Sequence, residues 1–250
     1  MKRAGDVLLS TVGLVVLSPI LLITMVLVWL QDRKSPVYLG ERIGRGGKPF
    51  QMVKIRSMIA DADKTGKLST ASDDPRITLV GRIIRRFKLD EFPQLVNVLR
   101  GEMSLVGPRP EVQRECLLYT NEEKELWQVR PGITDISSIV FADQGDITMG
   151  HANTHLAYNQ LIRPWKSRLA LLYVKKRNIV LDVQLCCLTL YNFVSRPRAL
   201  KALARVVENL TDDANLVAVV RRDFELAPTP PPGSVEIVSE AAIQKALRRI

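Results

Sequence analysis

The stretch FKLDEFPQLVNVLRGEMSLVGPRPE, residues 87–111, sets two carboxylates side by side and ends in an arginine held between two prolines. Apolar residues recur in it at helical spacing (Phe92, Leu95, Val96 and Leu99). This pattern predicts a helix that begins at Asp90 as its N-cap and ends at Gly101. Residues 103–106 predict a short strand, and a stiff loop carrying Arg109 follows it. An acidic pair at a helix start therefore lies close in sequence to a rigid arginine.

The acidic pair supports two interpretations. Paired acids at a helix start usually complement the helix dipole, which is a structural role. Arginines at 82, 85, 86 and 109 crowd the same region, however, and positive neighbours keep a carboxylate ionised. An ionised carboxylate can attack phosphorus or bind Mg²⁺. Arg109 can grip phosphate oxygens through two parallel hydrogen bonds, or form a surface salt bridge in a tight loop.

The overall charge narrows the class of partner. The 250 residues include 36 Lys+Arg against 26 Asp+Glu, a net charge of +10. Such an excess favours phosphate esters, nucleic acid or an acidic membrane surface as the partner. The three cysteines are an odd number without framework spacing, which fits a reducing compartment better than a secreted disulfide scaffold.

An apolar segment near the N-terminus predicts insertion into a membrane. Residues 7–30 contain no charged side chain, which meets the length criterion for a membrane helix, and no cleavage site follows. Ser18-Pro19 interrupts the segment at its middle, because proline removes a helical hydrogen bond. The break fits either a kinked spanning helix or a re-entrant corner, and basic residues on both flanks favour placing both ends in the cytoplasm.

The remaining elements follow from periodicity. Residues 35–49 are turn-rich, and period-two alternation predicts a strand over 50–58 with Lys54 and Arg56 on one face. Residues 60–74 predict a loop, and Asp74-Pro75 predicts a helix start. We expect 133–141 to be extended and 154–194 to be mostly helical. From about residue 226 the chain predicts a proline-rich linker and then a short basic helix over 241–250.

Several of these motifs together resemble the bacterial sugar transferase family, the monotopic polyprenyl-phosphate phosphoglycosyltransferases. The resemblance covers roughly residues 1–195, and its motifs keep the family's order along the chain. They are KIRSM (54–58), DPRIT (74–78), LDE (89–91) with the pattern that follows it, MSLVGPRPE (103–111) and RPGIT (130–134). Many members continue with Gly-Trp-Ala-Gln, whereas this chain has Asp135-Ile136-Ser137-Ser138, which is similar to a subgroup.

The resemblance implies a role for each matching residue. Asp90 matches the nucleophilic aspartate, and Glu91 matches its Mg²⁺-binding partner. The phosphate-binding set implied is Lys54, Arg56, Arg85, Arg109 and Arg130. Ser18 and Pro19 match the break that makes the family's membrane helix re-entrant. Tyr173 and Asp182 match a tyrosine and an aspartate in the family's late helix.

The resulting expectation is a mostly helical α+β fold in three parts. These are a re-entrant membrane hairpin (1–34), a cytosolic catalytic domain with interfacial amphipathic helices (35–195) and a C-terminal extension (196–250). The resemblance implies transfer of a sugar-1-phosphate from a UDP-sugar to polyprenyl (undecaprenyl) phosphate, with release of UMP. It places the protein at the cytosolic face of the bacterial inner membrane, in contact with lipid, and allows a homodimer.

Two other functions stay open from the sequence. A non-catalytic, membrane-anchored basic protein would bind lipid or a partner through the arginine face. A lipid-linked phosphohydrolase would use the same Asp and Mg²⁺ with water as the acceptor. Nucleic-acid binding explains the charge but not the apolar segment, so no nucleic-acid partner is expected.

Overall fold

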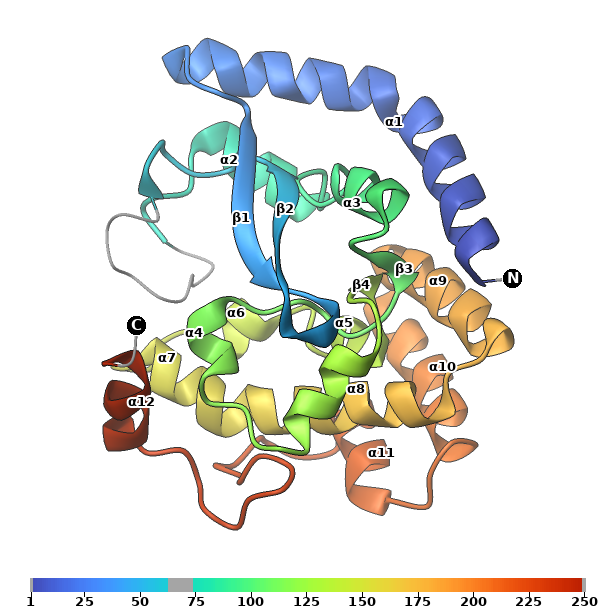
Figure 1. The fold of residues 1–250 in the computed structure, drawn as a ribbon, viewed down its shortest axis with the longest axis vertical. Coiled ribbons are helices and arrows are strands. Elements are labelled where there is room, and N and C mark those ends of the chain that lie inside the picture. Colours follow the sequence, from blue (N-terminus) through green and yellow to red (C-terminus); the bar gives the residue numbers. More distant parts are fainter. Residues whose placement is uncertain (1, 63–73, 249–250) are drawn as a thin grey trace.

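The computed structural model describes residues 2–62 and 74–248, and the predicted loop at 60–74 lies largely outside them. The fold is α+β and mostly helical, as expected (Figure 1). Its strands are β1 (Val37–Ile43), β2 (Pro49–Ile55), β3 (Ser104–Val106) and β4 (Gly132–Thr134). The helices are α1 (Lys2–Asp32), α2 (Leu79–Arg86), α3 (Gln94–Arg100), α4 (Gln113–Cys116), α5 (Ile136–Val140), α6 (Gln144–Ile147), α7 (Thr154–Ala157), α8 (Arg163–Lys176), α9 (Ile179–Val194), α10 (Arg196–Glu208), α11 (Ala214–Arg221) and α12 (Glu240–Leu247). Shorter helical turns are η1 (Arg45–Gly47), η3 (Glu123–Gln128) and the π-helical η4 (Tyr158–Ile162).

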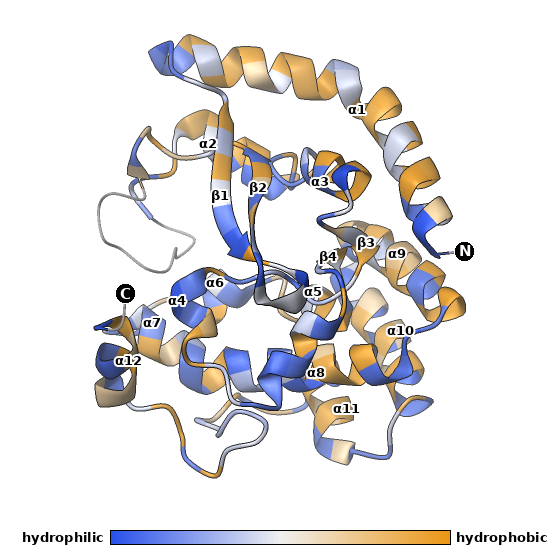
Figure 2. Cartoon of the chain, in the orientation of Figure 1, coloured by the Kyte–Doolittle hydropathy of each residue, from blue (hydrophilic) through white to orange (hydrophobic). Residues whose placement is uncertain are grey.

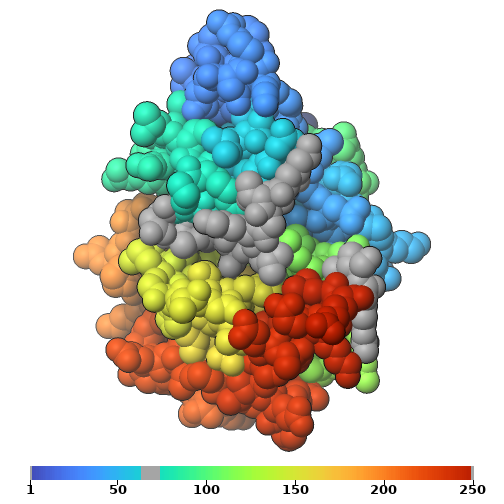
Figure 3. Space-filling model, turned by 90° about the vertical axis from the view of Figure 1, so that its left-hand side faces the viewer, coloured from blue at the N-terminus to red at the C-terminus, as the bar shows by residue number. Residues whose placement is uncertain are grey.

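Helix α1 is long and apolar enough to cross a membrane and is only slightly buried in the protein. It contains Pro19, bends along its length, and arches over the body of the molecule (Figure 1). Its central part is hydrophobic and its two ends are hydrophilic (Figure 2). In the view of Figure 3, α1 projects beyond the other elements. The helix therefore offers its apolar surface outward, away from the main core.

Both ends of α1 are bonded to the same body. Near the start, the Asp6 carboxylate accepts hydrogen bonds from Ser104 Oγ at 2.8 Å and from the Leu105 backbone N–H at 3.2 Å. At the other end, Asp32 forms a two-point ion pair with Arg56, with both N–O distances 2.6 Å. The inner face of the helix contributes Leu21 and Val28 to a small apolar cluster. The two ends of α1 are therefore attached to the same domain.

The elements under α1 form two small sheets. Strands β1 and β2 pair antiparallel as a hairpin, and β3 and β4 pair parallel. The parallel pair requires a close approach of two glycines: a Cβ on Gly132 would lie 2.0 Å from the backbone nitrogen of Gly107. Gly107 N–H also donates to Thr134 O at 2.9 Å, and Gly132 N–H donates to Pro108 O at 2.9 Å. This pairing fixes the loop that carries Arg109.

The largest apolar core lies among the later helices. Buried residues of α5, α8, α9, α10 and α11 form one cluster, so α10 and α11 from the predicted extension belong to the same core as α8. Beyond α11 the chain crosses this helical layer and ends in α12, next to α7 (Figure 1). Arg168 on α8 donates to Pro230 O at 2.8 Å, and Gln160 donates to Val238 O at 2.8 Å. Side chains of the main body therefore hold the proline-rich segment in place.

Several predicted elements are confirmed. The strand near 50–58 is β2, the strand near 103–106 is β3, and the region 154–194 is mainly helical. Gly101 ends α3 in the left-handed conformation with φ 83°. The short terminal helix is α12, as far as the described residues extend.

Other predictions are wrong in detail. Asp90 does not cap a helix, because α3 begins only at Gln94 and residues 87–93 form turns. Helix α2 begins after Thr78, whose hydroxyl accepts from Gly81 N–H, whereas Asp74 pairs with Arg76. The turn-rich 35–49 stretch contains β1. The stretch 133–141 is extended only at its start, because Asp135 caps α5 through the Ser138 N–H.

We predict that Gly132→Ala destabilises the protein severely, because the new methyl group would overlap the Gly107 backbone and force β3 and β4 apart. Thermal unfolding in detergent should show a melting temperature lower by about 10 °C or more, or no folded protein at all. Gly5→Ala is the matched control, because nothing lies within 4 Å of its new Cβ. An unchanged melting temperature for Gly132→Ala would contradict the tight β3–β4 contact.

Candidate active site

The acidic pair lies in the turn between α2 and α3, where backbone hydrogen bonds hold it against β2. Ile55 N–H donates to Asp90 O at 3.1 Å, and Leu89 N–H donates to Ile84 O at 2.9 Å. Lys88 adopts the left-handed conformation with φ 52°, which reverses the chain after α2. The turn is thus set by its neighbours on both sides. It presents Asp90 and Glu91 beside the end of β2.

Glu91 is held in a charged cluster with two cations. Lys54 Nζ donates to Glu91 Oε1 at 3.1 Å, and the Arg109 guanidinium makes a two-point contact with both carboxylate oxygens. Burial alone would raise the pKa of Glu91, but Arg109 and Lys54 outweigh it and hold this pKa well below its usual range. Glu91 is therefore ionised, and it fixes the positions of Arg109 and Lys54.

Asp90 differs sharply from its neighbour. Its residue is 8% exposed, yet within the described ranges 2–62 and 74–248 its carboxylate has neither a hydrogen bond nor an ion pair. Burial raises the pKa of Asp90, against the opposing effect of Lys54 and Arg85. The carboxylate therefore lies in a positive field without being bonded to any one cation. Such a group is available to a ligand.

Four cationic side chains surround the pair. Their charges act on the acidic groups from β2, from the end of α2, from the turn and from the loop after β3: Lys54, Arg85, Lys88 and Arg109. Arg85 is oriented by a 2.9 Å hydrogen bond from its Nε to Ser57 Oγ. Lys88 is the residue that the sequence analysis missed. The sequence feature that could have identified Lys88 is its position two residues before Asp90. A turn at this position, rather than a helix, brings Lys88 close to Glu91.

The structure leaves the other predicted residues outside this cluster. Arg56 is bonded to Asp32, and Arg130 Nε donates to Gly101 O at 2.8 Å. Tyr173 Oη donates to Asp182 at 2.6 Å, and Lys2 Nζ contacts Asp182 at 2.7 Å and Tyr173 Oη at 2.8 Å. Tyr173 and Asp182 thus anchor the start of α1. Ser18 lies inside α1 beside Pro19, where its hydroxyl donates to Val15 O at 2.8 Å.

The acidic turn also packs against the apolar helix. Leu89 and Phe92, which flank the pair, pack against the cluster of Leu21 and Val28 from α1 with Ile55 and Ile84. The nearby helix α2 leaves large apolar residues exposed, with Leu79 77% and Ile83 59% accessible. The acidic pair and the apolar surface are therefore parts of one packed unit.

The oxygen atoms of the acidic pair can be compared with the ligands that Mg²⁺ requires. Among the described residues no cluster of three His, Cys, Asp or Glu side chains is present, so a fully protein-enclosed metal site is not formed there. Mg²⁺ commonly needs only one or two carboxylates, with waters and substrate phosphates completing its shell. Asp90 has no competing partner in the described chain, and Glu91 Oε2 accepts only from Arg109 among these residues, which leaves it a second lone pair; the two carboxylates therefore fit that smaller requirement.

This arrangement suits chemistry at phosphorus. A free carboxylate can act as a nucleophile, and neighbouring cations can bind the non-bridging oxygens of a phosphate and stabilise the charge that develops on them. Arg109 already shows the two-point geometry that guanidinium groups use for carboxylate and phosphate alike.

Comparisons with known proteins identify relatives of this chain. The chain is 40% identical over 156 residues to the exopolysaccharide production protein ExoY of Sinorhizobium fredii, covering 55% of this chain and 68% of that protein. It is 37% identical to the UDP-glucose:undecaprenyl-phosphate glucose-1-phosphate transferase of Caulobacter vibrioides, covering 55% and 53%. It is 38% identical to the undecaprenyl-phosphate galactose phosphotransferase of Salmonella typhimurium, covering 54% and 32%. The chain thus spans about half of the second relative's length and a third of the last.

The family match is longer than any of these pairwise matches. It runs from residue 1 to residue 196 and so includes α1, the acidic turn and the helices through α9. The chain belongs to the bacterial sugar transferase family.

Proposed function

We propose that this protein transfers a sugar-1-phosphate from a UDP-sugar to undecaprenyl phosphate, through a covalent intermediate on Asp90. The carrying observation is the buried Asp90 carboxylate, unpaired within the described chain while the adjacent Glu91 is fully paired. The relatives' names provide the reaction class, since two of them are undecaprenyl-phosphate sugar phosphotransferases.

The chemistry would proceed in two exchanges. An Asp90 oxygen attacks the phosphorus that carries the sugar; a P–O bond forms, and the anhydride bond to UMP breaks. A phosphate oxygen of undecaprenyl phosphate then attacks the same phosphorus, giving undecaprenyl-diphosphate sugar and restoring the Asp90 carboxylate. Because one phosphoanhydride replaces another, we expect the reaction to be nearly thermoneutral and reversible.

The cations have separate tasks in this proposal. Arg109 and Arg85 would bind the oxygens of the pyrophosphate, and Lys54 would keep Glu91 oriented and neutralise charge near Asp90. Glu91, with Asp90 beside it, would hold Mg²⁺, which when bound neutralises pyrophosphate charge. Asp90 is only 8% exposed, and we expect bound substrate to displace the remaining water from it, which would favour transfer to a lipid phosphate over hydrolysis.

The membrane arrangement is part of the proposal. A straight helix of 31 residues would be about 46 Å long, more than the ~30 Å hydrocarbon core, and both ends of α1 are bonded to one body. We infer that α1 enters and leaves through the same leaflet. The exposed apolar residues of α2 and α9 would then rest at the interface on the cytosolic side, bringing Asp90 level with the lipid phosphate.

Asp90→Asn should abolish UMP release without loss of stability. Asparagine is a far weaker nucleophile, and it removes a buried carboxylate whose raised pKa means that ionisation at neutral pH costs stability. The measurements are UMP release from UDP-sugars, with and without undecaprenyl phosphate, and the melting temperature. Turnover without undecaprenyl phosphate would indicate a hydrolase, and turnover in EDTA would contradict the Mg²⁺ proposal.

Glu91→Gln is the matched control for stability, since it makes the same chemical change one residue away. It should lower the melting temperature and cost about 2 kcal/mol, because it leaves Arg109 and Lys54 without their carboxylate. Near-normal turnover of Asp90→Asn would overturn the nucleophile assignment.

Arg109→Lys should reduce kcat/KM by about 100-fold while the protein stays folded. Lysine keeps the charge but loses the planar two-point contact. Arg100→Lys is the control, since Arg100 is exposed at the end of α3. Equal effects of the two substitutions would argue against phosphate binding by Arg109.

The same-leaflet arrangement predicts that epitope tags at the N-terminus and C-terminus are both inaccessible to antibody in intact cells. Both tags should become accessible after the inner membrane is opened. A spanning helix would instead place the two tags on opposite sides, so external labelling of the N-terminal tag would refute the re-entrant arrangement.

A further inference from the structure

A pocket with both polar and apolar walls lies beside Arg109, between the loop after β3 and helix α8. Its walls include Arg109, Glu111, Ser137, Tyr158 and Lys166, with apolar Leu126. Arg109 is also the residue that contacts Glu91, so the pocket adjoins the acidic cluster through a shared side chain. None of the other wall residues has a part in the phosphate chemistry described above.

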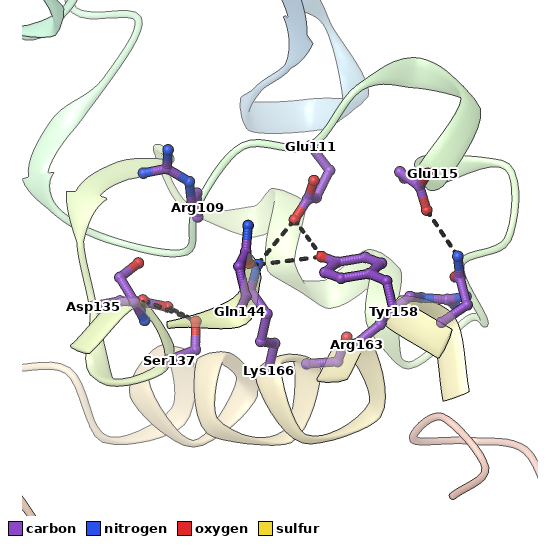
Figure 4. A network of polar contacts seen from close by, with 12 residues as sticks. Arg109, Glu111, Glu115, Asp135, Ser137, Gln144, Tyr158, Arg163 and Lys166 are labelled. Carbon is purple, nitrogen blue, oxygen red and sulfur yellow. Dashed lines mark hydrogen bonds and ion pairs between the residues drawn. The ribbon is translucent and has the colours of Figure 1, made fainter. Parts of the chain in front are cut away.

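The polar groups in this pocket converge from separate elements. Glu111, Gln144, Tyr158 and Lys166 point toward one another in Figure 4. Lys166 is 8% exposed, and among the described residues its ammonium makes three long hydrogen bonds: 3.2 Å to Tyr158 Oη, 3.3 Å to Gln144 and 3.4 Å to Glu111. These bonds use all three N–H donors of the ammonium, so a ligand oxygen would have to replace one of the long bonds.

Ser137 completes the polar wall from a different direction. Its hydroxyl donates to Asp135 at 2.9 Å, which fixes the hydroxyl and leaves its oxygen free to accept (Figure 4). Ser137 lies in the first turn of α5, two residues after the Asp135 that caps this helix. One wall of the pocket is therefore fixed by the start of α5.

The charges in the pocket are balanced. Lys166 pairs with Glu111, and Arg163 pairs with the buried Glu123 at 2.5 Å. Apart from Arg109, which the proposed function assigns to the donor pyrophosphate, the described walls therefore offer no unopposed cation to a second phosphate. Donors and acceptors are instead both present, which suits a neutral ligand rich in hydroxyl groups.

The walls do not form a slot for a flat base. Tyr119 stacks on Trp127 with ring centroids 5.7 Å apart, and Arg163 covers the Tyr119 ring at 5.5 Å. Lys166 lies over the Tyr158 ring at 5.3 Å. The aromatic faces nearest the pocket are thus already in contact with other groups, and the hydroxyls and charged heads form its recognition surface.

We propose that this pocket binds the sugar of the donor and discriminates among sugars through Tyr158, Lys166 and Ser137, while the donor phosphates lie on the Arg109 side. This inference rests on the proposed function, because it assigns one part of the same substrate.

The test measures kcat/KM for UMP release by the full-length protein, using UDP-glucose, UDP-galactose, UDP-N-acetylglucosamine and UDP-N-acetylgalactosamine with undecaprenyl phosphate. Tyr158→Phe and Ser137→Ala each delete one oxygen and should change the ratio of kcat/KM between the best sugar and its epimer by about tenfold. Inhibition by UMP, which lacks the sugar, should stay within twofold of wild type. Tyr191→Phe, the same change outside the pocket, should leave the ratio unaltered.

The outcomes separate the two proposals. If the wild-type protein releases UMP and the variants rank the four sugars as it does, the sugar pocket is wrong and the proposed function stands. Weakened UMP inhibition with an unchanged ranking would assign the pocket to the nucleoside and also overturn it. No turnover with any UDP-sugar would overturn the proposed function and the pocket with it. Ser137→Ala is the gentler of the two deletions, so it decides the question if Tyr158→Phe fails to fold.

Discussion

The two-point contact of Arg109 with Glu91 is the interaction on which the rest of the site depends. It joins the loop after β3 to the turn between α2 and α3, and Lys54 ties the same carboxylate to β2. Glu91 thereby holds Arg109 and Lys54 in place near Asp90. Two adjacent carboxylates in one positive field thus reach opposite states: the pKa of one is lowered by its partners and that of the other is raised by burial. The surroundings of the two carboxylates, rather than the difference between Asp and Glu, cause this difference in pKa.

A second constraint is the packing of the apolar helix against this turn. Leu89 and Phe92 contact the cluster formed with α1, and the ends of α1 are fixed to β3, α9 and β2. The loss of one end contact would free only part of the helix, because the other end and the buried inner face still hold it. In the proposed arrangement the membrane segment is therefore a structural support for the acidic turn as well as an anchor.

Much of the fold and site could be predicted where local chemistry decides the structure. Gly101 ends α3 as predicted, because the chain adopts the left-handed conformation there. The family motifs brought Lys54, Arg85, Asp90, Glu91 and Arg109 to one place. Arg56 shares a strand face with Lys54 in the sequence pattern, but Asp32, distant in sequence, binds it. An alternating sequence pattern predicts on which face of a strand a side chain lies, but it does not predict which residue that side chain will bond.

Two of the wrong predictions, those for residues 133–141 and for Asp90, share a physical cause: tertiary contacts outweighed local propensity. Residues 136–140 are rich in β-branched side chains, yet the Asp135 cap and the burial of Ile136, Ile139 and Val140 in the main core stabilise a helix there. Asp90 looked like a helix cap, but the hydrogen bond from Ile55 N–H to its carbonyl holds its backbone in a turn.

The position of Asp90 outside the helix has a consequence for catalysis. An N-cap aspartate directs its carboxylate to the helix N–H groups, which satisfy it and lower its nucleophilicity. In the turn, Asp90 has no such donors among the described residues; burial and the neighbouring Glu91 raise its pKa, while nearby cations lower it. The free energy that a capped carboxylate would contribute to folding is absent here. What remains is a carboxylate held in place by its backbone and without a protein partner among the described residues, which is the property that the proposed covalent intermediate on Asp90 would require.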